Sequence, residues 1–190
     1  MTSLAVIGAG VMGETLIAGL LRAGWDGSDI VAADRHAPRL AEIGQRHGIR
    51  TAGTGEAVGL ADAVVLVVKP QDVGEALPQI AATLRPGAPV VSLCAGITTA
   101  KLEAGLPPGT PVVRVMPNTP AQVDEGMAAV SAGSTAEDEH LEQATALLSA
   151  VGKVVVVPEK YQDAVTAISG SGPAYLYFVV EAMIDAGVML

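Results

Sequence analysis

Short apolar runs alternate along the chain with longer segments in which apolar residues recur at helical spacing. The runs are continuous rather than alternating in polarity, which is typical of strands covered on both faces of a sheet. They predict strands at Ser3–Gly8, Asp29–Asp34, Ala63–Val68, Pro89–Leu93, Val112–Met116, Met127–Ser131 and Lys153–Val157. The helical spacing predicts helices at Val11–Ala23, Pro38–His47, Asp72–Leu84, Thr98–Leu106 and Ala136–Val151.

The order of these elements indicates the fold class. Strands and helices alternate with short connections, which favours an α/β fold with a doubly wound, mainly parallel sheet. Ser134 and Thr135 precede the last of these helices and Glu137 lies near its start, so we expect a capped beginning there. We assign residues 1–158 to this sheet domain.

The pattern changes after Val157. Pro158–Lys160 forms a predicted boundary, and Tyr161–Ile168 and Pro173–Leu190 are predicted helices separated by the Ser-Gly-Ser-Gly segment 169–172. We therefore expect residues 159–190 to be the start of an all-helical C-terminal domain. The apolar pattern still runs at residue 190 without a stop signal, so we expect a truncated domain or a covering subunit.

Composition and charge narrow the classes of function. The 190 residues carry a net charge of −9 with scattered acidic side chains, whereas nucleic-acid binding needs clustered Lys and Arg. The first 20 residues lack the basic start of a signal peptide, and no apolar run reaches membrane-spanning length. We expect a cytoplasmic protein without nucleic-acid or membrane partners.

Residues that commonly act as nucleophiles or metal ligands are few. Cys94 is the only cysteine and lies in an apolar stretch, so a buried core position is favoured over a nucleophile. His36, His47 and His140 are far apart in sequence and lack partners at metal-ligand spacing. We therefore predict no metal site.

A glycine-rich segment, Gly8–Gly13, follows the first predicted strand and opens the first predicted helix. Its G-x-G-x-x-G pattern suits a tight turn, a close backbone approach to a pyrophosphate and close packing of helix on strand. The helix N-terminus then faces the anion. In this context the pattern predicts a Rossmann-type dinucleotide site, and a glycine-rich turn without a ligand is the alternative.

The end of the second predicted strand bears on the choice of cofactor. Asp34 lies there, 21 residues beyond Gly13, where an acidic residue typically binds the adenosine ribose and favours NAD. Arg35, with Arg39 one turn further on, is suited instead to a 2′-phosphate. These signals leave NAD and NADP open, and we expect NADP.

Three later segments carry a more specific pattern. They are Val67–Pro70, Met116–Ala121 and Ser169–Tyr175, with Cys94–Thr98 between the first two. In this order they resemble the pyrroline-5-carboxylate reductases, and the likeness spans essentially the whole chain. The resemblance implies hydride transfer from NAD(P)H to the ring C=N of 1-pyrroline-5-carboxylate, giving L-proline in the last step of proline biosynthesis.

The resemblance also implies roles for individual residues, around the pyrophosphate, the adenosine ribose and the path to the nicotinamide. The implied cofactor-binding residues are Ile7, Gly8, Ala9, Gly10, Val11, Met12, Gly13, Asp34, Arg35, His36, Val68, Lys69, Pro70, Ala95 and Gly96. The implied catalytic residues are Lys69, Asn118 and Thr119, with Asn118 beside the reacting ring. The implied substrate-binding residues are Ser169, Gly170, Ser171, Gly172 and Pro173.

Reduction of an imine needs few acid–base side chains, because a protonated iminium accepts hydride readily once the reactants are positioned. Lys69 is a candidate acid, but a role in orienting the cofactor is favoured. Pro173 suits a first helical position, and the Ser-Gly residues before it would leave backbone N–H groups free for a carboxylate. An ordinary capped turn is the alternative. Relatives continue into helices that form an intertwined dimer, so we expect a homodimer or higher homo-oligomer.

Two other functions stay open. A reductase of the β-hydroxyacid dehydrogenase type would need a catalytic Lys in the helix after the sheet, and no Lys follows Lys160. A non-catalytic NADP-binding protein is favoured if the protein ends at residue 190, because half of the substrate pocket would then be missing.

Overall fold

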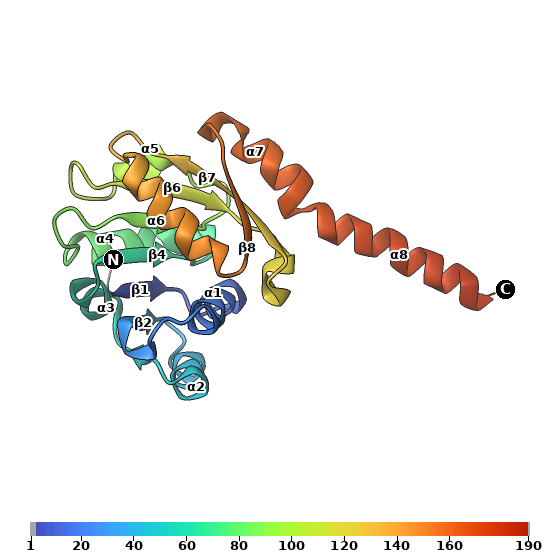
Figure 1. The fold of residues 1–190 in the computed structure, drawn as a ribbon, viewed down its shortest axis with the longest axis horizontal. Helices are drawn as coiled ribbons and strands as arrows, with labels where there is room; N and C mark the ends of the chain where they lie inside the picture. The colour runs from blue at the N-terminus through green and yellow to red at the C-terminus, as the bar shows by residue number, and fades with distance from the viewer. Residues whose placement is uncertain (1–2, 190) are drawn as a thin grey trace.

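One eight-stranded sheet forms the centre of residues 3–189, the part of the chain that this computed structural model describes (Figure 1). The strand order is β3-β2-β1-β4-β5-β6-β7-β8. The strands are β1 (Leu4–Ile7), β2 (Ile30–Ala33), β3 (Arg50–Thr51), β4 (Ala63–Leu66), β5 (Val90–Ser92), β6 (Val112–Met116), β7 (Gly126–Ala132) and β8 (Gly152–Val156).

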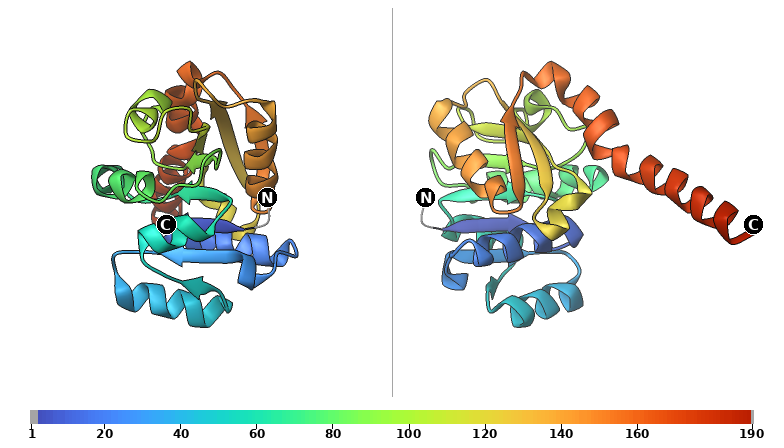
Figure 2. Two further views of the ribbon diagram at one scale, coloured as in Figure 1. Left: turned by 90° about the vertical axis from the view of Figure 1, so that its left-hand side faces the viewer. Right: turned by 45° about the vertical axis from the view of Figure 1, so that its right-hand side comes forward.

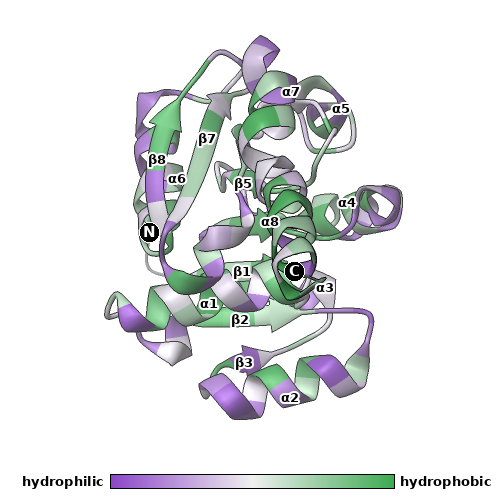
Figure 3. Ribbon diagram, turned by 90° about the vertical axis from the view of Figure 1, so that its right-hand side faces the viewer, coloured by the Kyte–Doolittle hydropathy of each residue, from purple (hydrophilic) through white to green (hydrophobic). Residues whose placement is uncertain are grey.

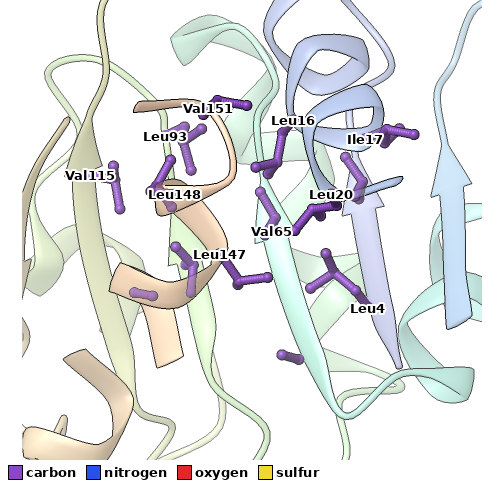
Figure 4. Close-up of a cluster of buried hydrophobic side chains, with 14 of the residues drawn as sticks. Leu4, Leu16, Ile17, Leu20, Val65, Leu93, Val115, Leu147, Leu148 and Val151 are labelled. Carbon is purple, nitrogen blue, oxygen red and sulfur yellow. The ribbon is translucent and has the colours of Figure 1, made fainter. Parts of the chain in front are cut away.

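Helices cover both faces of this sheet (Figure 2). The helices are α1 (Val11–Arg22), α2 (Ala37–His47), α3 (Thr54–Leu60), α4 (Val73–Ala81), α5 (Thr99–Glu103), α6 (Asp138–Ser149), α7 (Gln162–Val165) and α8 (Gly172–Met189). Side chains of α1, α2 and α6 pack on one face, and those of α3, α4 and α5 pack on the other. Leu4, Leu20 and Leu147 show the first of these two cores in Figure 4.

The strand directions confirm the predicted doubly wound, mainly parallel sheet. Neighbours from β3 to β6 are parallel, the β6–β7 pair is antiparallel, and β8 pairs parallel with β7. The antiparallel pair has a local cause, because the short connection 117–125 leaves no room for the crossover that a parallel pair needs. The predicted strands are all present, and the two-residue β3 and helix α3 are additions that the pattern missed.

The predicted capped start of α6 is confirmed: Glu137 is the capping residue and forms a reciprocal pair of bonds with His140. Ser134 and Thr135 take no part in this cap. Those two residues bond elsewhere: Ser134 N donates to Glu103 Oε1 at 2.6 Å, and Thr135 Oγ1 donates to the Thr110 carbonyl at 2.7 Å. Glu103 ends α5 and Thr110 lies in the connection from α5 to β6, so both residues before the cap are held by tertiary contacts.

The prediction that residues 169–172 form a turn between two C-terminal helices is wrong, because only Ser171 lies outside a helix there. Thr166–Gly170 forms a π-helical turn between α7 and α8, and Ser171 N donates to the Thr166 carbonyl at 2.8 Å. The expected free N–H groups before Pro173 are therefore partly used within the helix. Leu190, the last residue of the predicted helix, lies outside the described residues.

Helix α8 projects away from the sheet domain (Figure 1). It is largely hydrophobic in Figure 3, and its large apolar side chains are exposed, with Phe178 72% accessible. A helix that is apolar around most of its girth is normally buried against a partner. No helix within residues 3–189 is both long and apolar enough to cross a membrane.

Candidate functional site

Close backbone packing shapes the glycine-rich loop between β1 and α1. Gly8 has a φ of +111°, and a Cβ built there would lie 2.7 Å from the Val67 carbonyl oxygen. A Cβ on Gly13 would lie 2.0 Å from the Gly8 carbonyl oxygen. Both glycines are therefore required by the fold. Gly10 differs, because a Cβ there would meet no protein atom within 4 Å.

A cavity of about 220 Å³ opens above this loop. It lies where the strand order reverses, since the chain runs from β1 outward to β2 and β3 and then returns to β4 on the other side of β1. Open α/β sheets bind ligands at this switch point. The cavity is lined by Ile7, Gly8, Gly10, Ala33, Asp34, Arg35, Thr54, Val67, Val68, Lys69, Asp72, Glu75, Ala76 and Gln79.

Half of the residues that line this cavity are among the cofactor-binding residues predicted from the sequence. The predicted residues that line the cavity are Ile7, Gly8, Gly10, Asp34, Arg35, Val68 and Lys69. The other predicted cofactor residues, which are not among its lining residues, are Ala9, Val11, Met12, Gly13, His36, Pro70, Ala95 and Gly96. Four of these, Ala9, Val11, His36 and Pro70, adjoin lining residues in sequence. Met12 and Gly13 lie in the first turn of α1, and Ala95 and Gly96 follow β5. The lining residues that sequence reasoning missed are Ala33, Thr54, Val67, Asp72, Glu75, Ala76 and Gln79.

The Asp34 carboxylate ties the glycine-rich loop to the end of β2. Its Oδ2 accepts a hydrogen bond from Ala9 N at 2.7 Å, and its Oδ1 accepts one from His36 N at 2.8 Å. A carboxylate has about four acceptor positions, so it can bind further donors. Asp34 thus shapes the loop in addition to facing the cavity.

Only one of the two candidate phosphate-binding arginines lines the cavity. Arg35 Nη1 lies 2.8 Å from Asp72 Oδ1, and 68% of the Arg35 side chain is exposed. Arg39 is instead paired with Glu14 and Glu42 on the surface of α1 and α2. The structure therefore does not support a role for Arg39 beside the cavity.

Glu14 is the centre of the network that holds Arg39. It also accepts hydrogen bonds from Arg46 at 2.6 Å and is bonded to His47 Nε2 at 3.0 Å. Partial burial alone would raise the pKa of the Glu14 carboxyl, but the bonds from His47 and Arg46 and the charge of Arg39 outweigh it. The pKa of Glu14 lies below its ordinary value, so the carboxylate stays charged and keeps the Arg39 side chain, which comes from α2, against α1.

Lys69 and Cys94 lie beyond the ends of neighbouring strands. Lys69 is exposed, lines the cavity, and has no ion pair within residues 3–189. Cys94 is buried, with its Sγ 3.3 Å from the Val68 carbonyl oxygen, and burial raises the pKa of its thiol. The prediction of a buried core cysteine is thus confirmed. Such a desolvated thiol is a poor nucleophile. Across the described residues no group of three metal-binding side chains forms.

The structure brings together two of the residues proposed to meet the substrate. Asn118 Nδ2 donates to Ser169 Oγ at 3.2 Å, and Asn118 Oδ1 accepts from Met127 N at 2.8 Å. Gly170 lies close to β6, since a Cβ there would be 2.5 Å from Met116 Cε. Thr119 is exposed at the start of the next turn. The π-helical turn therefore lies against the carboxyl end of β6.

Known proteins of one family are similar to this chain over nearly its whole length. The chain is 46% identical to the pyrroline-5-carboxylate reductase of Corynebacterium melassecola, covering 100% of this chain and 72% of that protein. It is 44% identical to the enzyme of that name from Mycobacterium tuberculosis, covering 99% and 66%. The chain belongs to the pyrroline-5-carboxylate reductase family. It spans about two thirds of the length of these relatives.

Family models and solved structures add to this assignment. Residues 3–96 match the model described as NADP oxidoreductase coenzyme F420-dependent, and residues 159–190 match the model for pyrroline-5-carboxylate reductase dimerisation. The Coxiella burnetii pyrroline-5-carboxylate reductase superposes with a TM-score of 0.92 at 32% identity, covering 100% of this chain and 72% of that one. The Plasmodium falciparum enzyme with NADP bound superposes with 0.88 at 28% identity, covering 99% and 70%.

The geometry of the loop predicts that Gly10 serves a ligand rather than the fold. We expect Gly10→Val to abolish dinucleotide binding, because its side chain would occupy the open space above the loop. The unfolding temperature should fall by at most about 4 °C, the effect of a weakened helix cap. Calorimetric titration with NADPH and thermal unfolding measure the two effects.

Gly13→Ala is the matched control. Its added Cβ would collide with the Gly8 carbonyl, so this variant should lose stability first and binding only as a consequence. An unchanged NADPH affinity in Gly10→Val would contradict the interpretation of the loop.

Proposed function

We propose that the protein reduces 1-pyrroline-5-carboxylate to L-proline with hydride from a nicotinamide dinucleotide, in the last step of proline biosynthesis. One juxtaposition supports this most: the cavity at the switch point lies in the same sheet domain whose β6 end carries the Asn118–Ser169 pair. Membership of the pyrroline-5-carboxylate reductase family supports this proposal.

The residues of the cavity fit a dinucleotide. Gly10 offers open space at the N-terminus of α1, where the first backbone N–H groups of the helix lack partners within it and suit a pyrophosphate. We assign Asp34 and Arg35 to the adenosine ribose of such a ligand, because they follow β2 and line the cavity. The proposed ligand would supply the hydride, while Val68, Lys69, Pro70, Ala95 and Gly96 would orient its nicotinamide end.

The residues at the end of β6 are suited to holding a small ring. Asn118 is fixed by two hydrogen bonds, so its amide is already oriented when a substrate arrives. We assign Asn118 and Thr119 to the reacting ring, and Ser169, Gly170, Ser171, Gly172 and Pro173 to the substrate carboxylate. Lys69 lines the cofactor cavity, which favours an orienting role over that of an acid.

Turnover of 1-pyrroline-5-carboxylate with NADPH tests the proposed function. We expect oxidation of NADPH, followed at its absorbance, to depend on the imine and to yield proline. NADPH binding without turnover would favour the non-catalytic alternative, and turnover of a β-hydroxyacid alone would favour the other reductase class.

For the cofactor we propose NADPH over NADH, with Arg35 as the residue that distinguishes them. Arg35→Ala should weaken NADPH binding by about 1.5–3 kcal/mol, the usual contribution of a charged hydrogen bond, and leave NADH nearly unchanged. Calorimetric titrations with both cofactors measure this difference.

Asp72→Asn provides the opposite change at the same ion pair. It frees Arg35 and removes a negative charge from the cavity wall, so NADPH binding should tighten while NADH changes little. Equal losses for both cofactors in Arg35→Ala would assign Arg35 to packing or to the general field.

We further propose that the protein is a homodimer or larger, assembled through α8. The exposed apolar side chains of α8 and the dimerisation model over residues 159–190 support this. Phe178→Glu should shift the protein toward smaller species in light scattering at micromolar concentration, because a charge would enter the buried interface. Leu60→Glu on α3, an exposed apolar position away from α8, is the control. A monomer that Phe178→Glu leaves unchanged would rule out this interface.

The remaining proposals concern organisation and environment. We propose that residues 1–158 form the dinucleotide-binding domain and that residues 159–190 belong to the helical substrate and dimerisation domain. We also propose a cytoplasmic location and a small-molecule substrate, without nucleic-acid, membrane or metal partners. The net charge of −9 supports the exclusion of nucleic acid.

A further inference from the structure

One carboxylate joins the sheet domain to the C-terminal helices. Glu159 begins the short turn after β8, and its two oxygens accept hydrogen bonds from Thr99 N and Thr99 Oγ1, both at 2.7 Å. Glu159 Oε1 also lies 3.3 Å from Arg114 Nη1. Thr99 opens α5 and Arg114 lies on β6, so three distant parts of the chain meet at this group.

The burial of Arg114 makes this contact obligatory. Its side chain is 6% exposed, and a buried guanidinium needs a carboxylate partner. Arg114 Nη2 also lies 3.3 Å from Asp163, but that side chain is 92% exposed, so solvent weakens the pair. Partial burial alone would raise the pKa of Glu159, yet the bonds from Thr99 and Arg114 outweigh it and the pKa lies below its ordinary value.

A second contact holds the next turn of the same segment. Gln162 is fully buried, and its Nε2 donates to Ser131 Oγ at 2.8 Å and to the Ala129 carbonyl at 3.2 Å. Ser131 Oγ donates in turn to the Val157 carbonyl at 2.7 Å. The segment 159–162 is therefore fixed on β7 through Gln162 as well as on β6 and α5 through Glu159.

These contacts fix the distance between two parts of the proposed site, the loop after β5 on the cofactor side and the π-helical turn on the substrate side. Gly96 belongs to the loop after β5, which is assigned to the nicotinamide end of the cofactor. Thr99 follows Gly96 by three residues, at the start of α5. Ser169, which bonds to Asn118, lies ten residues after Glu159 and one turn beyond α7. A movement of Glu159 away from Thr99 would thus change the position of the π-helical turn relative to that loop.

We propose that Glu159 is a positioning residue which, through Thr99 and Arg114, fixes the loop after β5 relative to the π-helical turn carrying Ser169. The inference rests on the proposed function, which assigns the loop after β5 to the cofactor and the π-helical turn to the substrate. Glu159 is not among the residues assigned to either reactant, and it does not line the cavity. Its effect should therefore appear in the binding of the imine rather than in the binding of NADPH, because most of the residues assigned to NADPH belong to the glycine-rich loop, the end of β2 and the segment after β4.

Thr99→Val tests the proposal, because it removes one hydrogen bond to Glu159 and leaves Arg114 paired. We expect amide hydrogen exchange over residues 166–171 to quicken roughly tenfold, the equivalent of one charged hydrogen bond, with exchange in β1 unchanged. The KM for 1-pyrroline-5-carboxylate should rise by about the same factor, while the NADPH Kd stays within about twofold.

Two variants complete the experiment. Thr99→Ser restores the hydroxyl and should restore both readouts, whereas Thr110→Val removes a hydroxyl of similar burial that bonds only to the Pro107 carbonyl and should change neither. Unchanged exchange over 166–171 in Thr99→Val, or a rise equal to that in β1, would overturn the proposal. Failure of the native protein to bind NADPH would instead count against the proposed function, and the exchange result would still stand.

Discussion

The contact of backbone on backbone between β1, α1 and the end of β4 determines the geometry of the site. Gly8 and Gly13 have no room for a side chain, so α1 can begin directly against the strands. This packing fixes where the first N–H groups of the helix point and leaves the space above Gly10 open. The Asp34 carboxylate then holds the loop to β2. The cavity is thus a consequence of packing that the glycines allow.

The fold was largely predictable because most of its strands are buried on both faces and appear as continuous apolar runs. The pattern missed β3 because that strand has only two residues, both exposed. It missed α3 because Gly55 and Gly59 give a short helix poor intrinsic propensity. Ala57 and Val58 are fully buried, so tertiary packing stabilises α3. No local signal could have shown this.

The site was predictable where its residues follow a strand, and not where distant elements meet. The glycine-rich loop and Arg35 are identified by their spacing, whereas Asp72 and Gln79 reach the cavity from a different βα unit. Arg39 lies one turn beyond Arg35, a spacing suited to a shared phosphate, but its ion pair with Glu14 holds its side chain against α1. The turn predicted at residues 169–172 is helical because contacts with Met116 and Asn118 outweigh the low helix propensity of Ser and Gly.

The two halves of the proposed site depend on different physical interactions. The cofactor half belongs to a sheet whose two cores are complete within the domain, so its geometry does not require a partner. The substrate half is held by Glu159 and Gln162 at one end and continues into α8, whose apolar surface is exposed at the other. A single exposed apolar helix gains most of its stability from packing. It follows that association through α8 would order the π-helical turn far more than the glycine-rich loop, so substrate binding would depend on assembly more strongly than cofactor binding.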